Sequence, residues 1–257
     1  MNLRCVVVFP LYRQPDTIEL AFLTHGVQVL KDFDIVIAAP DKLILTPEFG
    51  ALSELKIIRF QDHFFSGING YNRLLLSKEF YTSFSAYEYV LIHQADVYIF
   101  KNELLEWCNR GYAYIGPPWL RSQDNILKQN FNRLRKLISK NYGFKHNKVG
   151  NGGFSLRNTA QALKVLSMAP APLLTKFKNE THHSFNEDVF WSFEAPRIST
   201  GFRIPDMVEA LHFGIEFEPE KAIELLNGEL PFGCHAPIVQ DLRFWKRHIP
   251  ELKHYPH

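Results

Sequence analysis

The sequence predicts an α/β fold built around a mostly parallel central sheet, and three observations lead to this prediction. At the start of the chain, short β-branched runs alternate with a helical pattern, the order that parallel strands with right-handed crossovers require. An apolar run over residues 89–92 has the composition of a strand buried on both faces. No GxGxxG or P-loop signature is present, which argues against dinucleotide dehydrogenases and P-loop kinases.

The first hundred residues supply the strands expected to run in parallel. These strands share a β-branched or aromatic composition and a polar or proline end: residues 5–9, 34–39, 55–60 and 89–92. A helix is expected after Asp16 and Thr17, which can cap it, because apolar residues then recur at helical spacing. Glycine and asparagine predict a turn over residues 66–72, followed by a helix over residues 73–84.

Shorter elements alternate in the rest of the chain. The expected strands cover residues 97–100, 112–115, 154–157 and 210–217. The expected helices cover residues 102–110, 159–168 and 242–248, and residues 186–188 open another that continues over residues 189–191. Residues 124–141 predict an amphipathic, basic helix, whose charges indicate either a solvated face or a contact with phosphate or acceptor. No repeat or linker is visible, so we expect a single domain.

Composition and charge argue against several classes of protein. Lysine and arginine number 29 against 27 aspartate and glutamate, and this balance gives no support to nucleic-acid binding. Three scattered cysteines are too few for a disulfide framework and fit a reducing compartment. The first residues lack signal-peptide features, and no apolar run reaches the roughly 18 residues of a membrane span. We therefore expect a cytoplasmic protein whose aromatic, basic C-terminus makes at most peripheral membrane contact.

Polar residues that could carry chemistry gather at the ends of predicted elements. Asp96 follows the central strand, at the edge where open α/β sheets bind ligands. Three glycines surround Asn151 in VGNGGFSLR and allow a ligand to approach the main chain closely. Glu187 and Asp188 open a helix, where two acids also suit the helix dipole. His235 in PFGCHA is a further candidate. The acids could instead form a turn or cap a helix, and His235 could instead make a buried hydrogen bond.

Six strings occur together and in one order: YNRLLLSKEFY, YEYVLIHQADVYIF, YAYIGPPW, VGNGGFSLR, NEDVFW and PFGCHA. In this combination, which covers residues 66–245, the chain resembles a little-characterised bacterial family of presumed GT-A glycosyltransferases. The resemblance implies a GT-A-like (nucleotide-diphospho-sugar transferase) sandwich in one domain over residues 1–257. It also implies that residues 1–100 bind a nucleotide-sugar donor and that residues 101–257 bind a glycan or lipid-linked glycan acceptor, as in surface polysaccharide synthesis.

The resemblance further implies a divalent metal next to the central strand. GT-A enzymes often carry an Asp-x-Asp motif there, and this chain has Gln94, Ala95 and Asp96 instead. Asp96 and His235 are then the expected ligands of Mn²⁺ or Mg²⁺, and the missing first acid leaves the metal requirement open. If no metal binds, we expect Arg73 to neutralise the diphosphate; its alternative is an ordinary charge on a helix surface.

Donor and acceptor contacts are expected in the same motifs. The expected donor contacts lie near the first strand ends and the central strand: Pro10, Tyr12, Asp41, Asn72, Arg73 and Gln94. The expected sugar contacts lie in later motifs: Trp119, Asn151, Gly152, Gly153 and Trp191. An inverting transfer needs one carboxylate to take the proton of the acceptor hydroxyl. The resemblance implies that Glu187 and Asp188 lie where this base is placed, and it favours Asp188, because the second acid is usually the base in related transferases with an ED pair. Glu187 would hold an acceptor hydroxyl or cap its helix.

Two other functions stay open. The missing first acid suits a catalytically degenerate GT-A-like module that binds a nucleotide or glycan without turnover. A nucleotidyltransferase also combines an α/β sheet with a metal, but it normally needs a glycine-rich, basic loop after the first strand. The loop in this chain, FPLYRQP, has one arginine and no glycine, which disfavours this third function.

Overall fold

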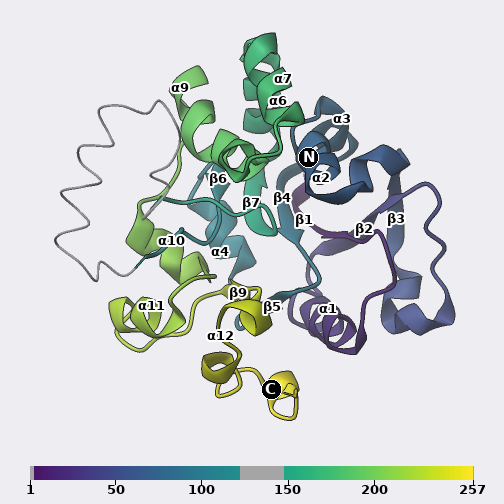
Figure 1. Ribbon diagram of the computed structural model, residues 1–257, viewed down its shortest axis with the longest axis vertical. Helices are drawn as coiled ribbons and strands as arrows, with labels where there is room; N and C mark the ends of the chain where they lie inside the picture. The colour runs from purple at the N-terminus through teal and green to yellow at the C-terminus, as the bar shows by residue number, and fades with distance from the viewer. Residues whose placement is uncertain (1–2, 122–147, 257) are drawn as a thin grey trace.

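The computed structural model describes residues 3–121 and 148–256 (Figure 1). Its main sheet has six strands in the order β3-β2-β1-β4-β7-β6. These are β1 Leu3–Pro10, β2 Asp34–Pro40, β3 Lys56–Phe60, β4 Tyr87–His93, β6 Tyr114–Ile115 and β7 Phe154–Asn158. β1 pairs in parallel with β2 and β4, and β2 with β3, whereas β7 runs antiparallel to β4 and β6. The predicted α/β fold with a mostly parallel sheet is confirmed.

A second sheet brings the C-terminal part of the chain to the end of β4. Its order is β5-β9-β8, with β5 Val97–Ile99, β8 Gly214–Ile215 and β9 Gly233–His235. β5 follows closely after β4 and pairs antiparallel with β9, so that Val97 lies opposite His235. This pairing places His235 beside Asp96, although the two residues are far apart in sequence.

The first helix follows the predicted capping signal. α1 Thr17–Val29 begins after Asp16, whose side chain accepts hydrogen bonds from the N–H groups of Ile18 and Glu19. The Glu19 carboxylate accepts from the Asp16 N–H (2.9 Å), which completes a capping box. These bonds satisfy the free donors at the helix start and fix the end of the loop between β1 and α1.

The turn predicted over residues 66–72 is wrong, because α2 Gly67–Leu75 includes nearly all of it. α2 ends before Ser77, whose side chain caps α3 Lys78–Ser83. The glycine at position 70 serves close packing instead of a turn. A Cβ on Gly70 would lie 2.6 Å from the carbonyl oxygen of His63, so only glycine lets α2 approach the preceding segment.

The strand predicted over residues 210–217 is wrong over most of its length. Asp206 accepts a hydrogen bond from the Glu209 N–H (2.9 Å) and caps α10 Met207–Phe213, after which only β8 is a strand. The apolar residues of this segment are buried in a helix, where their spacing in so short a run resembles that of a strand.

The remaining helices are α4 Leu104–Asn109, α6 Thr159–Met168, α7 Ala171–Asn179, α8 Glu187–Val189, α9 Ala195–Ile198, α11 Pro219–Leu225 and α12 Pro237–Trp245. A π-helical turn, Phe190–Glu194, joins α8 to α9, and short 3₁₀ turns cover Pro47–Glu54, Asp62–Phe65, His183–Phe185 and Pro250–Leu252. In Figure 1, α2, α3, α6 and α7 lie above the main sheet, and α1, α11 and α12 lie below it. The basic helix predicted over residues 124–141 lies outside the described residues.

The larger of the two hydrophobic clusters joins the main sheet to helices of the second half of the chain. Its residues extend from β1 through β4 and β7 to Trp191 and Phe213. All three cysteines are free and buried in the protein interior. Among the described residues, we find no helix with the length and apolar character needed to cross a membrane. The core forms a rigid base for the loops at the C-terminal ends of β1 and β4.

Candidate functional site

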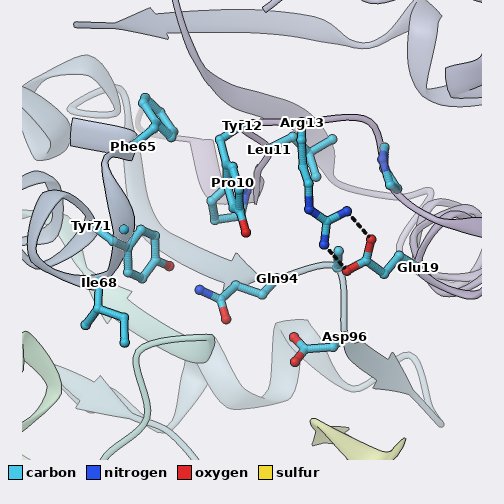
Figure 2. Close-up of a pocket in the computed structure, with 13 residues that line it drawn as sticks. Pro10, Leu11, Tyr12, Arg13, Glu19, Phe65, Ile68, Tyr71, Gln94 and Asp96 are labelled. Carbon is cyan, nitrogen blue, oxygen red and sulfur yellow. Dashed lines mark hydrogen bonds and ion pairs between the residues drawn. The ribbon is translucent and has the colours of Figure 1, made fainter. Parts of the chain in front are cut away.

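A cavity of about 430 Å³, here named the first pocket, opens at the C-terminal ends of β1 and β4. It is lined by the loop after β1, the start of α2 and the residues after β4. Four predicted ligand contacts line it: Pro10, Tyr12, Gln94 and Asp96. Figure 2 shows these side chains around one open space. This edge is where open α/β sheets bind ligands.

The first pocket combines exposed apolar side chains with an ion pair. Tyr12 is 56% exposed and Ile68 is 70% exposed, so both can pack on a flat ring. Arg13 donates two hydrogen bonds of 2.7 Å to the Glu19 carboxylate (Figure 2). Because Glu19 belongs to the capping box of α1, the guanidinium is held in a defined place. Of the residues that line this pocket, Arg13 is the one with a full positive charge.

A larger cavity of about 770 Å³, the second pocket, adjoins the first. Six predicted contacts line it: Trp119, Asn151, Gly152, Gly153, Asp188 and His235. The half-buried Asp188 carboxylate accepts a hydrogen bond from the Val189 N–H (2.8 Å). His235 Nε2 lies 3.3 Å from Gln94 Oε1 and 3.4 Å from Asp96 Oδ1, and both of those residues line the first pocket. The two pockets therefore meet at these three side chains.

Two carboxylates hold His235 where the pockets meet. Its Nε2 atom lies 3.4 Å from Asp96 Oδ1, and its Nδ1 atom lies 3.2 Å from Glu216 Oε1. Burial lowers the pKa of His235, but the hydrogen bonds and charges of Asp96 and Glu216 outweigh it and raise this pKa to about 10. Burial likewise raises the pKa of Asp96, and the contact with His235 outweighs it and lowers that pKa. His235 is therefore a cation at neutral pH in the ligand-free protein.

The side chains of Gln94, Asp96 and His235 offer atoms that fit a divalent metal, and one of the three is a carboxylate. The described residues contain no group of three His, Cys, Asp or Glu side chains arranged to hold a metal. Gln94 adds a neutral oxygen. His235 Nε2 lies 3.3 Å from Gln94 Oε1 and 3.4 Å from Asp96 Oδ1, and these distances suit neighbouring ligands that each lie about 2.1 Å from one ion. Glu216 would orient the imidazole through Nδ1, as carboxylates behind metal-bound histidines do. An ion has to displace the Nε2 proton, so its binding should weaken as pH falls.

The two central glycines of VGNGGFSLR make this junction possible. A Cβ on Gly153 would lie 2.3 Å from both Gln94 Oε1 and His235 Nε2, and one on Gly152 would lie 2.5 Å from Glu187 Oε1. We predicted these glycines as places where a sugar reaches the main chain. The structure adds a second reason for them, because side chains from other motifs pack directly against both.

Asn151 shapes the loop from within. Its Oδ1 atom accepts hydrogen bonds from the N–H groups of Gly153 and Phe154, both 2.8 Å long. Its Nδ2 atom donates to Glu216 Oε2 (2.7 Å). The predicted direct bond from Asn151 to a sugar does not fit, because these side-chain atoms are already engaged by the protein.

Three predicted ligand contacts are buried away from both pockets, and these predictions are wrong. Trp191 is 1% exposed and stacks on Phe202, with ring centroids 5.8 Å apart, so it cannot stack on a sugar. Glu187 has both carboxylate oxygens bound by Arg157 and cannot hold an acceptor hydroxyl. The Asn72 side chain binds the backbone N–H of Glu187. All three are residue types that often bind ligands, but their side chains are buried and cannot reach a ligand in either pocket.

Two further predicted contacts, Asp41 and Arg73, lie outside both pockets. Asp41 is exposed at the end of β2, and its carbonyl oxygen accepts a hydrogen bond from Arg59. Arg73 donates from Nε to the carbonyl oxygen of Lys178 (3.0 Å) and so ties α2 to α7. Its position on the helix directs it away from the first pocket, where Arg13 supplies the positive charge instead.

Sequence reasoning passed over three residues that the structure brings to the site: Arg13, Tyr71 and Glu216. Arg13 stands in FPLYRQP directly after β1, and this position could have pointed to it. Tyr71 lines the first pocket and donates from its hydroxyl to the Gly152 carbonyl oxygen (3.0 Å). No local signal marks Glu216, because its partners come from distant motifs.

The stability of the protein should depend on the charge of His235. Its pKa is higher in the folded protein than the ordinary value of 6.5, so its ionic contacts stabilise the fold fully below that value. They are lost as pH rises toward about 10. We expect the Tm of the wild type to fall more steeply over this pH range than the Tm of His235→Gln. The exposed His254→Gln should keep the wild-type slope; equal slopes in all three proteins would contradict the expectation.

The fold is that of the GT-A glycosyltransferases. Three solved structures have a TM-score of 0.54 to this chain. Mouse xyloside xylosyltransferase 1 in its apo form is 11% identical, with 91% of this chain and 97% of that chain covered. The galactosyltransferase LgtC, in complex with donor and acceptor sugar analogues, is 12% identical, with 96% and 91% covered. The bifunctional glycosyltransferase WbbM is 11% identical, with 99% and 50% covered.

The chain belongs to the protein family of unknown function DUF5672, whose model matches residues 54–235. This segment runs from just before β3 to the end of β9, so it includes Asp96, Asp188 and His235. No curated protein matches the sequence. The structural similarity establishes the fold, and because the identities are low, the activity has to be argued from the site.

Proposed function

We propose that this protein is a glycosyltransferase that moves a sugar from a nucleotide-sugar donor to a glycan or lipid-linked glycan acceptor. One observation carries the proposal: two pockets meet at Gln94, Asp96 and His235, and a carboxylate, Asp188, lines the second. A transfer reaction needs two neighbouring binding sites with a shared boundary where the bond is exchanged. The six motifs that resemble bacterial glycosyltransferases support a cytoplasmic role in surface polysaccharide synthesis.

The donor would occupy the first pocket. Tyr12 and Ile68 offer exposed apolar surface to the nucleobase, and Pro10, the last residue of β1, lines the same pocket. The diphosphate would extend toward Asp96, and Arg13 would supply the positive charge that lines this pocket. This orientation places the donor sugar at the boundary with the second pocket.

Gln94, Asp96 and His235 would hold Mn²⁺ or Mg²⁺, which would stabilise the charge that develops on the leaving nucleoside diphosphate. The chain's own residues supply the rest. Asp188 would take the proton from an acceptor hydroxyl while that oxygen attacks the anomeric carbon. The bond between this carbon and the diphosphate oxygen breaks, and the nucleoside diphosphate leaves. One carboxylate used in this way inverts the anomeric configuration.

A binding module without turnover is the second candidate, and a specific observation favours it. With a pKa of about 10, His235 is itself a cation that could contact a phosphate without any metal. Gln94 in place of the first acid also reduces the negative charge that would attract a metal. A nucleotide would then bind to the first pocket and no sugar would be transferred.

Thermal stability with UDP, GDP and CMP, each with and without Mn²⁺, tests the proposal. A nucleotide at about a hundredfold its Kd should stabilise the protein by about 2.7 kcal/mol, a clear rise in Tm. We expect one nucleotide to raise the Tm with Mn²⁺, and Asp96→Ala to lose this rise. Arg13→Ala should weaken it and Arg73→Ala should not, because only Arg13 lines the first pocket.

Three results would count against it in different ways. A metal-independent rise that Asp96→Ala retains would favour the binding module. A rise unaffected by Arg13→Ala would remove the assigned diphosphate position. The absence of any rise would argue against nucleotide-sugar chemistry altogether.

A further inference from the structure

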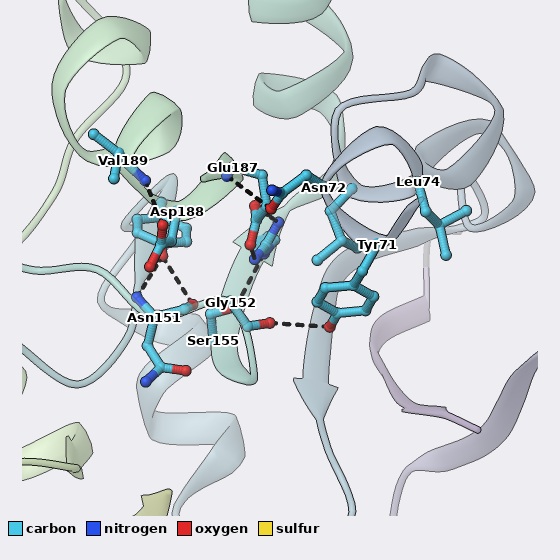
Figure 3. A network of polar contacts seen from close by, with 12 residues as sticks. Tyr71, Asn72, Leu74, Asn151, Gly152, Ser155, Glu187, Asp188 and Val189 are labelled. Atoms are coloured by element: carbon cyan, nitrogen blue, oxygen red, sulfur yellow. Dashed lines mark hydrogen bonds and ion pairs between the residues drawn. The ribbon is translucent and has the colours of Figure 1, made fainter. Parts of the chain in front are cut away.

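A buried polar cluster, formed by Asn72, Arg157 and Glu187, adjoins Asp188 through Glu187. Figure 3 shows Glu187 and Asn72 beside Asp188. The three residues of the cluster come from α2, from β7 and from the first position of α8. All are at most 3% exposed, so none of them can touch a ligand in either pocket. Two of them were predicted as ligand contacts, and their burial requires a different role.

Arg157 and Glu187 form a bidentate ion pair in the core. Arg157 Nη1 donates to Glu187 Oε2 (2.8 Å) and Nη2 donates to Oε1 (3.0 Å). Arg157 is fixed in turn, because Nε donates to Ser155 Oγ and Nη1 to the Tyr81 hydroxyl, both at 3.0 Å. Glu187 is therefore tied to the central sheet through a guanidinium that has little freedom to move.

Asn72 holds the same turn from the side of the first pocket. Its Oδ1 atom accepts from the Glu187 N–H (3.1 Å), and its Nδ2 atom donates to Asn186 Oδ1 (3.3 Å). On the far side of the turn, Ser192 Oγ donates to the Asp188 carbonyl oxygen (2.7 Å). The backbone on both sides of the Asp188 Cα is thus held by Asn72 of α2 and by Ser192 of the π-helical turn. Arg157 of β7 holds the adjoining Glu187 side chain.

Stability alone is a poor explanation for such a cluster. Removing two charges from water costs about as much free energy as their attraction returns, so an apolar pair of similar volume fills a core equally well. What an ion pair adds is direction, since a bidentate contact allows one relative orientation of its partners. This direction matters here because the very next residue is the carboxylate that lines the second pocket.

We propose that Asn72, Arg157 and Glu187 are positioning residues that fix the Asp188 carboxylate relative to the donor pocket. The inference rests on the proposed function, in which Asp188 is the base. The neighbour of Asn72, Tyr71, lines the first pocket and bonds to Gly152 of the second, so α2 carries both the donor wall and the support of the base (Figure 3). A shift of about 1 Å in such a group can lower a rate by about a hundredfold.

Asn72→Ala is the variant that tests this, because it removes both side-chain bonds to the turn and leaves the ion pair in place. Asn102→Ala is the matched control; its side chain donates one bond to Asp32 on the exposed surface. The substrate is the nucleotide sugar that carries the same base as the nucleotide found to raise the Tm. With it, we expect kcat to fall about tenfold to a hundredfold in Asn72→Ala. The KM for the nucleotide sugar should equal that of the control. The rise in Tm that the nucleotide causes should also equal that of the control.

Hydrogen–deuterium exchange gives a second readout that needs no activity. Backbone amides over residues 186–192 should exchange faster in Asn72→Ala than in the wild type or Asn102→Ala, and those of β1 and β2 should not change. An unchanged kcat, or unchanged exchange over this segment, would overturn the inference. If the wild type neither binds nor transfers, the proposed function fails, and the exchange comparison still decides whether Asn72 holds the turn.

Should Asn72→Ala fold poorly, the pair Arg157→Met with Glu187→Leu provides an independent variant, because it replaces the ion pair by apolar side chains of similar volume. This double variant should retain the nucleotide-induced rise in Tm, and its kcat should be lower than that of the wild type. A folded double variant with wild-type kcat would also overturn the inference.

Discussion

Asp188→Asn is expected to lower the rate of sugar transfer by about 10²–10⁴-fold, the range that general base catalysis contributes. Asparagine keeps the size of the side chain and its hydrogen bond from the Val189 N–H, but it cannot take a proton from the acceptor hydroxyl. The nucleotide-induced rise in Tm should stay unchanged, because Asp188 lines the second pocket and not the first. Initial rates with saturating nucleotide sugar measure the effect.

Asp241→Asn is the matched control for this prediction. Asp241 also lines the second pocket, and its carboxylate accepts a hydrogen bond from the Phe244 N–H (2.9 Å), much as Asp188 does from Val189. Wild-type turnover in Asp188→Asn would remove this residue from the mechanism. Analysis of the product anomer by NMR completes the test, since retention of configuration would contradict direct attack assisted by a single base.

Arg157→Met is expected to destabilise the protein by about 3–5 kcal/mol, because it leaves the Glu187 carboxylate buried without its partner. The two side chains are 1% and 2% exposed, so water cannot replace the lost contacts. Urea unfolding of the two proteins at equal pH measures the difference. In the double variant Arg157→Met with Glu187→Leu, most of this loss should be recovered.

The same variant has a predicted pH dependence. Burial raises the pKa of Glu187 in the wild type even though Arg157 opposes it, and removal of Arg157 should raise this pKa further. A carboxyl with a raised pKa costs stability once pH rises above its unfolded value, so the Arg157→Met loss should be smaller near pH 5 than near pH 8. Arg4→Met, which breaks the half-exposed pair with Glu88, should cost no more than about 1 kcal/mol. Equal losses at both positions would contradict the assignment.

Local patterns in the sequence were sufficient to predict most of the main sheet. The apolar runs that became β1, β2, β3 and β4 were placed to within two residues at each end, because strands buried on both faces leave a compositional signal. Short elements were harder. The segment that became α10 and β8 is short enough for its apolar spacing to fit either a helix or a strand, and the Asp206 cap decided between them.

Long-range pairing decided what each candidate residue can do. Glu187 and Asp188 are adjacent acids, and only the bidentate contact with Arg157, from another strand, shows which one is buried and which one lines a pocket. Polarity could not reveal this, because burial depends on which side of a turn meets the core.

By itself, the sequence determined an α/β protein whose polar motifs follow its strands, since strand composition and helix capping are encoded by neighbouring residues. The tertiary structure alone decided that Asp96 meets His235 across β5 and β9. It also decided that Trp191 is core and that Arg13, not Arg73, lines the first pocket. The physical reason is the same in each case: exposure and partners arise from contacts between segments that are distant in the chain, and no local pattern records them.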